Sequence, residues 1–482
     1  MSTGLFSIAR SALLTHQTAL QTISQNIANA ETPGYTRQEA VLVANTPVRM
    51  PYGNVGTGVR VETIIRKRDI LLDESYRAAA GQAGDAELKS DLLGRMEGIF
   101  GEPSEAGMTN ALDQFWSAWS DLASNPGSGS SRAVVQQRGR QVTQLFNDYD
   151  TQLTQQRTSS MERLSNSVAQ INAFAGQVAE LNNRIMSSET GGDTANDLRD
   201  QRDLILDKLS QIAGTRVINQ ADGSVSVIIG NSTLVDSATA RPLSLQVEIP
   251  DPMPTVVPSD LPVRIRLGNS PDRLAPLGGE LSALVTNINT DIPGMRGRLD
   301  AMAASLATSV NTAHTAGFTF TGNTIPGTAA GNFFDAGTVT NPVRASTFRL
   351  DTVIAGDPSR IAASGDANAP TDNTAALALS ALRTTNDTVS YTTPSGNVES
   401  GTFLGFFRNT VTTLGIGVRS AQDNASVYGT LAEQGELRRQ SVSGVSTDEE
   451  LVNMLRVQQS YTAATKLIQT ADEMLQTLLS MI

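Results

Sequence analysis

The sequence contains no cysteine and only two histidines among its 482 residues. Without cysteine the chain has no disulfides, no thiolate nucleophile and no cysteine-ligated zinc. The histidines, His16 and His314, have no second histidine or compact carboxylate cluster near them in the sequence. We therefore expect no metal ion and no cofactor. A hydrolase or protease would need a catalytic histidine, a cysteine or opposed carboxylates, which the sequence does not supply.

Long apolar runs, a phosphate-binding glycine loop and an excess of positive charge are also missing. No stretch of about 18 apolar residues occurs, and the start lacks a basic leading segment, so we expect no membrane span and no cleavable secretory signal. The glycines are scattered or paired, as in Gly191-Gly192 and Gly278-Gly279, which predicts no nucleotide site. The net charge of −12 opposes binding to nucleic acid phosphates.

Small and polar residues are abundant instead. The hydrophobic fraction is 39% and the aromatic fraction 5%, values typical of a soluble, extended protein with long helices. A chain of 482 residues is too long for one ordinary domain, so we expect two to four domains.

The two ends of the chain carry heptad patterns. Near the start, one register holds Phe6, Leu13, Leu20 and Ile27, and the other holds Ala9, His16, Ile23 and Ala30. Near the end, one register holds Met454, Tyr461, Ile468, Leu475 and Ile482, and the other holds Val457, Ala464, Ala471 and Leu478. A repeat of seven predicts coiled-coil helices, from Leu5 to Ala30 and from about Asp448 to the terminus.

Local signals mark the inner boundaries of these helices. Pro33 and Gly34 predict that the first helix ends before Glu31. Ser446 or Thr447, followed by Glu449 or Glu450, predicts a capping box at the start of the last helix.

Each terminal helix needs a partner, since an isolated helix is marginally stable and gains most from packing its apolar face. The obvious partner is the other terminus. Apolar positions outside the seams, such as Leu5, Leu451 and Leu455, leave surface over for neighbouring subunits. Our hypothesis is that both ends are largely disordered in the monomer and become ordered on assembly.

The interior of the chain is predicted to consist of helices interrupted by two β-rich stretches. Helical periodicity predicts helices over 70–100, 110–124, 131–186, 195–213, 280–316 and 403–443. Alternating apolar residues and turn signals predict β structure over 215–277 and 318–369. The expected fold is multidomain and mainly α, with β-rich insertions. We expect a terminal α-helical coiled-coil domain (1–50 plus 444–482), a helical middle domain (51–316 plus 372–443) and a small outer β domain (317–371).

The terminal segments resemble those of the flagellar axial proteins, the family of rod, hook and hook-associated subunits. The resemblance lies in SQNIANAETPGYTRQ near the start and STDEELVNMLRVQQSYTAATKLIQTADEMLQTLLSMI at the end. Interior blocks agree with it in order: ALDQFWSAWSDLASNP, NDLRDQRDLILDKLS, ADGSVSVIIG, GGELSALV, VNTAHTAGFTFTGN and GNFF. These blocks favour the subunits at the junction between hook and filament over hook protein or flagellin.

The resemblance implies a non-enzymatic structural subunit of the extracellular flagellum, exported through the flagellum-specific type III apparatus. Its partners would be further copies of itself in a ring or helical layer, hook protein, the third hook-associated protein and a flagellar export chaperone. Another axial component, either hook protein or the third hook-associated protein, is the alternative, and a secreted adhesin is less favoured. The implied assembly interface comprises Phe6, Leu13, Leu20, Ile23, Ile27, Asn29, Pro33, Gly34, Tyr35, Met454, Tyr461, Ile468, Leu475, Leu478 and Ile482.

Several other side chains have plainer interpretations. Phe115, Trp116 and Trp119 share one helix face and are expected to be core. The run 66–68, Arg-Lys-Arg, is expected to pair with Asp69 or with acids of a neighbouring subunit. The acidic groups at 448–450 and 472–473 are expected to be solvated or to cap helices.

Overall fold

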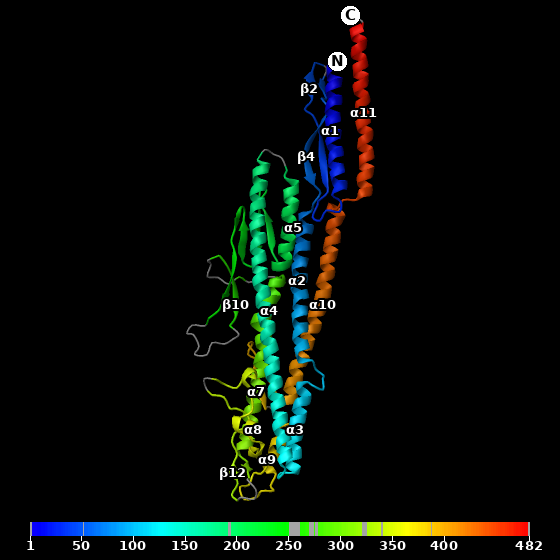
Figure 1. Ribbon diagram of the computed structural model, residues 1–482. Helices are drawn as coiled ribbons and strands as arrows, with labels where there is room; N and C mark the ends of the chain where they lie inside the picture. Colours follow the sequence, from blue (N-terminus) through cyan, green and yellow to red (C-terminus); the bar gives the residue numbers. More distant parts are fainter. Residues whose placement is uncertain are drawn as a thin grey trace.

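The computed structural model describes residues 2–51, 53–190, 194–249, 261–268, 274, 278–320, 325–338, 341–386 and 388–480. The molecule is elongated, and both termini lie at the same end (Figure 1). Two long helices, α4 and α10, run along a helical body, while the first and last helices extend beyond it as a separate pair (Figure 1).

The helices occupy most of the chain. They are α1 Ser2–Ala28, α2 Ile70–Phe100, α3 Met108–Ser124, α4 Gly129–Glu189, α5 Asn196–Ala213, α6 Glu280–Thr286, α7 Ile292–Thr315, α8 Thr352–Gly356, α9 Thr374–Ala381, α10 Phe403–Ser443 and α11 Thr447–Ser480. The predicted bounds of α2 and α10 are confirmed to the residue. The helix predicted over 280–316 is divided by a π-helical turn, Asn287–Asp291, where the Ser160 hydroxyl donates to Asn287 Oδ1 over 3.0 Å.

Capping side chains explain where several helices start. Asp69 accepts from the backbone N–H of Leu71 at the start of α2, and Thr402 accepts from that of Gly405 at the start of α10. Ser446 accepts from the N–H of Glu449, so the predicted start of α11 is confirmed. Each bond satisfies an N–H group that has no partner within the helix.

The strands are short and antiparallel. They are β1 Gln38–Ala44, β2 Val48–Met50, β3 Gly53–Val55, β4 Val59–Arg66, β5 Arg216–Asn219, β6 Val225–Ile229, β7 Ser232–Asp236, β8 Thr239–Ala240, β9 Leu243–Val247, β10 Val263–Leu267, β11 Phe318–Thr319, β12 Thr328–Ala329, β13 Val389–Thr392 and β14 Val398–Gly401. Strands β5 to β8 form a four-stranded sheet, and β1 pairs with β4 in a ribbon beside α1. The ribbon was not predicted.

The β prediction for 318–369 holds only for β11 and β12 and two isolated bridges. The rest of its described part consists of loops, α8 and two short 3₁₀ turns at Ala345–Thr347 and Pro358–Arg360. Its aromatic side chains Phe333, Phe334 and Phe348 are buried in the same cluster as residues of α3, α4, α7 and α10. The division into domains stays a prediction.

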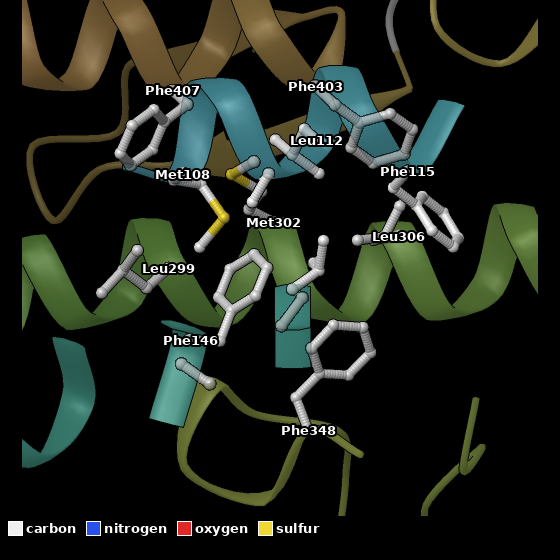
Figure 2. Close-up of a cluster of buried hydrophobic side chains, with 14 of the residues drawn as sticks. Met108, Leu112, Phe115, Phe146, Leu299, Met302, Leu306, Phe348, Phe403 and Phe407 are labelled. Carbon is white, nitrogen blue, oxygen red and sulfur yellow. The ribbon is translucent and has the colours of Figure 1, made fainter. Parts of the chain in front are cut away.

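Two buried clusters form the core of the body. In the first, side chains from α3, α4, α7, α10 and the loop after Ala345–Thr347 point into a common interior (Figure 2), among them Met108, Leu112, Phe115, Phe146, Leu299, Met302, Leu306, Phe348, Phe403 and Phe407. Trp116 and Trp119 are buried there too, so the prediction that Phe115, Trp116 and Trp119 are core is confirmed. The second cluster joins α2, α4, α5 and α6 to the sheets β5–β8 and β9–β10.

His314 is buried beside the first cluster, and its ring lies 6.1 Å from that of Trp119. The backbone N–H of Ala362 donates to His314 Nε2 over 3.0 Å, so the proton of the neutral ring is on Nδ1 and is donated to the carbonyl of Gly331 at 2.7 Å. Burial lowers the pKa of the His314 imidazole to about 4. Because the unfolded chain binds a proton near its ordinary pKa of about 6.5, the stability of the fold is complete above that pH and declines below it.

We predict that the body loses roughly 1.5 kcal/mol of stability between pH 6.5 and pH 5 through His314 alone. Urea unfolding followed by the fluorescence of Trp116 and Trp119, which lie in the same cluster, measures this. The variant His314→Gln should be less stable at pH 7 but should lack this part of the pH dependence. Equal losses in both proteins would contradict the assignment.

Candidate assembly interface

Helices α1 and α11 lie side by side at the end of the molecule where the termini meet (Figure 1). Alanines of the seams, Ala9, Ala464 and Ala471, are buried. Small side chains allow two helix backbones to approach closely, and the larger seam residues cover the flanks of the contact. The ribbon covers another side of α1, where the hydroxyl of Thr15 donates to the carbonyl of Val59 at 3.1 Å.

The predicted interface residues differ in exposure. Ile23 is buried, and Leu13, Leu20, Ile27, Asn29, Tyr35, Met454, Ile468 and Leu475 are half-buried. Phe6, Pro33, Gly34 and Tyr461 are exposed. The side chain of Leu478 and the whole of Ile482 lie outside the described residues. The contacts between α1 and α11 therefore use most of the aliphatic seam within one chain, which leaves other surfaces for neighbours.

The part of α11 outside the seam carries a second set of apolar side chains, and we call this set the outer face. It comprises Leu451, Val452, Leu455, Leu467 and Met474, all exposed. Val452 is 66% exposed and Leu455 is 60% exposed. On α1 the side chains of Leu5, Phe6 and Leu14 are exposed as well. So many large apolar side chains on one short pair of helices mark an interaction surface.

The buried amide of Asn26 connects the two terminal helices to the ribbon. Its Nδ2 donates to the carbonyl of Gln38 and to Glu450 Oε2, both at 2.9 Å. Its Oδ1 accepts from the hydroxyl of Tyr35 at 2.9 Å and from the N–H of Gln38 at 3.0 Å. All four hydrogen-bonding positions of the amide are thereby used. Burial, followed by Asp197, Asp200 and Glu450, raises the pKa of Tyr35 to about 12, so its hydroxyl stays a donor.

Glu450 is only 2% exposed, although it lies in the first turn of α11. Besides Asn26, its partner is Arg37, whose Nε donates to Glu450 Oε1 at 2.9 Å. The expectation that the acids at 448–450 are solvated or capping is therefore wrong for Glu450. The heptad pattern gave no sign of this contact, because the first turn of a helix is where acidic residues are common anyway.

Residues 32–35, Thr-Pro-Gly-Tyr, form a turn that we call the TPGY turn. This turn also connects the terminal helices α1 and α11 to the body. Gly34 has φ +81°, and a Cβ placed there would lie 3.3 Å from Leu204 of α5, so a left-handed conformation and a close approach both favour glycine. The N–H of Thr36 donates to Asp200 Oδ2 of α5 at 3.0 Å, and that of Arg37 donates to the carbonyl of Ser443 at the end of α10 at 2.9 Å.

Arginines and aspartates complete this joint between the terminal helices and the body. Arg66 Nη1 lies 2.7 Å from Asp200 and 2.8 Å from Asp203, and Arg68 Nε lies 2.6 Å from Asp73. Burial would raise the pKa of Asp203, but the guanidiniums of Arg68, Arg66 and Arg77 outweigh it and lower that pKa well below its usual range.

The prediction that the basic run pairs with Asp69 is wrong, because Asp69 caps α2. Arg66 and Arg68 pair with acids of α5 and α2, and Lys67 pairs with Glu39. The acids of α5 had no visible role in the sequence. Their signal was the spacing of Asp200, Asp203 and Asp207, which places them along one side of a helix.

No helix among the described residues is long and apolar enough to cross a membrane. The same part of the chain holds no group of three or more acidic or histidine side chains suited to a metal ion.

We predict that Asn26→Ala weakens the joint, because it leaves the Glu450 carboxylate and the Tyr35 hydroxyl short of a partner. Each buried group left unsatisfied costs roughly 1–3 kcal/mol. Limited proteolysis of the purified chain should then release α1 and α11 about 5 to 150 times faster. Asn29→Ala is the matched control, since Asn29 bonds only to Gln25 and Thr32 of its own turn. Equal release from both variants would contradict the role of Asn26.

Three families of known proteins match separate parts of the chain. Residues 93–334 match the flagellar hook-associated protein FlgK helical domain. Residues 6–36 match the flagella basal body rod protein family, and residues 434–481 match the flagellar basal body rod FlgEFG protein C-terminal family. The first of these two matches covers most of α1 and the TPGY turn, and the second covers the end of α10 and all of α11.

The relatives that match this chain over nearly its whole length share one name. Flagellar hook-associated protein 1 of Bacillus subtilis (strain 168) is 30% identical over 97% of this chain and 96% of its own length. Its counterpart in Escherichia coli (strain K12) is 25% identical over 99% of both chains. Among solved structures, the flagellar hook junction protein FlgK from Burkholderia pseudomallei has the same fold, with a TM-score of 0.63 and 17% identity over 77% of this chain and 100% of that one.

Proposed function

Because the chain belongs to the family of flagellar hook-associated protein 1, we propose that it forms the junction between the hook and the filament by adding its terminal helices to a shared wall. The observation that carries this proposal is the outer face of α11, which is apolar and uncovered in the single chain. Its five large side chains are about half exposed, so each would gain roughly 1 kcal/mol on full burial.

A neighbour that covers the outer face generates a repeating assembly. The outer face differs from the surfaces that α1 and the ribbon present to solvent, so contact between them joins two different patches. Contacts between two different patches do not close into a dimer, so they repeat from subunit to subunit and build rings or helical layers. We infer that the predicted residues exposed on α1 and in the TPGY turn, including Phe6, Pro33 and Gly34, lie at such contacts.

The family also suggests the partners and the place of the subunit. We propose that hook protein lies below this layer and the third hook-associated protein above it, that the chain is exported through the type III apparatus with a chaperone, and that it is found outside the cell. Its role is structural, and we propose no enzymatic activity. A junction has to carry load from hook to filament, and the joint of Asn26, Glu450 and the α5 acids would pass that load to the body.

We predict that Leu455→Arg abolishes incorporation at the hook tip while the free subunit keeps its helical content. A charged side chain at a site 60% exposed is harmless in the monomer but must be desolvated when a neighbour covers it. Electron microscopy of cells that carry the variant should show hooks without filaments. The culture medium of these cells should contain monomeric filament protein.

Leu377→Arg is the matched control for that experiment. Leu377 lies in α9 of the body, far from the termini (Figure 1), and is 48% exposed. This variant should give normal filaments. Normal filaments from Leu455→Arg would contradict the proposal, and loss of hooks in a strain that lacks the protein would favour a different axial component.

We further predict that the amides of α1 and α11 exchange with deuterium much faster than those of α4 in the monomer, and become protected in the assembly. The reason is that α11 packs mainly against α1 and leaves its outer face in water. Hydrogen exchange followed by mass spectrometry on free and assembled protein measures this. Strong protection of both terminal helices in the free chain would contradict the hypothesis that they become ordered on assembly.

A further inference from the structure

A pocket of about 240 Å³ lies where β4, α2 and α5 meet the turn between β5 and β6. Five arginines and three carboxylates line it, namely Arg66, Arg68, Arg77, Arg199, Arg202, Asp73, Glu74 and Asp203. Two blocks that stood out in the sequence, NDLRDQRDLILDKLS and ADGSVSVIIG, come together here. The acids of the first block also belong to the joint with the terminal helices, but the contacts of those helices do not account for the second block.

Four of the five arginines have carboxylate partners. Arg66, Arg68 and Arg77 each contact Asp203, and Arg199 holds Glu189 with two bonds of 2.7 and 2.6 Å. Arg202 differs from them, because no described carboxylate lies within 4.0 Å of its guanidinium. The pocket therefore contains one cation without a direct counter-ion.

Arg202 is nevertheless only 2% exposed. Its Nη1 donates to Asn182 Oδ1 at 2.9 Å and to the carbonyl of Gly223 at 2.8 Å, while its buried Nε has no partner among the described residues. Burial is the main influence on its pKa and lowers it to about 10, so the group is still charged at neutral pH. Asp203 and Glu189 attract this charge, but neither makes a direct contact with it. A buried charge without a direct counter-ion is costly, and a guanidinium is well suited to pairing with an anion.

The β5–β6 turn is shaped to close this pocket. Gly223 has φ +85°, and a Cβ placed there would lie 2.6 Å from Glu189 Oε2 and 3.0 Å from Arg199 Nη2. The left-handed conformation favours glycine at this position, and in this conformation the carbonyl of Gly223 reaches Arg202. The turn and α5 therefore together fix where the Arg202 guanidinium lies.

We propose that this pocket binds a small oxyanion such as phosphate or sulfate, with Arg202 as its principal ligand. A guanidinium presents parallel N–H donors that match two oxygens of such an ion. The pocket is smaller than the roughly 300–1,000 Å³ of sites for drug-sized molecules, which suits an inorganic ion. The bound ion would supply the missing counter-charge and tie the β5–β6 turn to the helix that anchors the terminal pair.

Equilibrium dialysis of the full-length monomer against radiolabelled phosphate, at constant ionic strength in chloride, tests the proposal. The protein should bind one phosphate per chain. Arg202→Met should weaken binding about tenfold or more, because hydrogen bonds to a charged group are lost. Arg163→Met removes an exposed arginine that pairs with Glu280, and it should bind phosphate as the unaltered protein does.

A second measurement needs no variant and covers the case in which Arg202→Met does not fold. Crystals of the unaltered protein soaked in selenate should show an anomalous peak beside Arg202. The proposal is overturned if the monomer shows no saturable phosphate binding, if a folded Arg202→Met binds phosphate as well as the unaltered protein, or if selenate occupies only other positions.

Discussion

A buried carboxylate at the start of α11 determines where the two ends of the chain can lie. Burying the Glu450 carboxylate is unfavourable unless its charge is compensated. Arg37 forms an ion pair with one of its oxygens, and Asn26 donates a hydrogen bond to the other. Asn26 belongs to α1 and Arg37 to the segment that leads into the ribbon, so α11 reaches this arrangement only when both are in place. The helices then run alongside each other, and their alanine-lined seam closes as a consequence.

The same segment carries the connection to the body, through Gly34 against Leu204 and Thr36 on Asp200. A pair of helices held firmly at its base but uncovered along its length suits a subunit that is added to a growing assembly. The base gives each subunit the same geometry, and the outer face of α11 supplies free energy only when a neighbour arrives. A neighbour then stabilises along their length two helices whose base is already fixed.

The sequence predicted the terminal helices, the bounds of α2 and α10 and the aromatic core, because heptads, helix caps and one-sided apolar faces are local signals. It did not predict the partner of Glu450, since that contact joins residues 26, 37 and 450, which no local pattern relates. The ribbon was missed because its alternation is incomplete, with a bulge between Val41 and Leu42. The loops near Phe333 and Phe348 were read as β structure because their glycine and asparagine turn signals also occur between strands.

In the assembled flagellum, we expect neighbouring subunits to cover the outer face of α11 while the joint at its base stays intact. An experimental structure of the assembled hook–filament junction at side-chain resolution tests it most directly. We expect Val452 and Leu455 to be buried against an adjacent subunit, with the contact between Asn26 and Glu450 preserved. Exposure of those two side chains in the assembly, or separation of Glu450 from Asn26, would contradict the account.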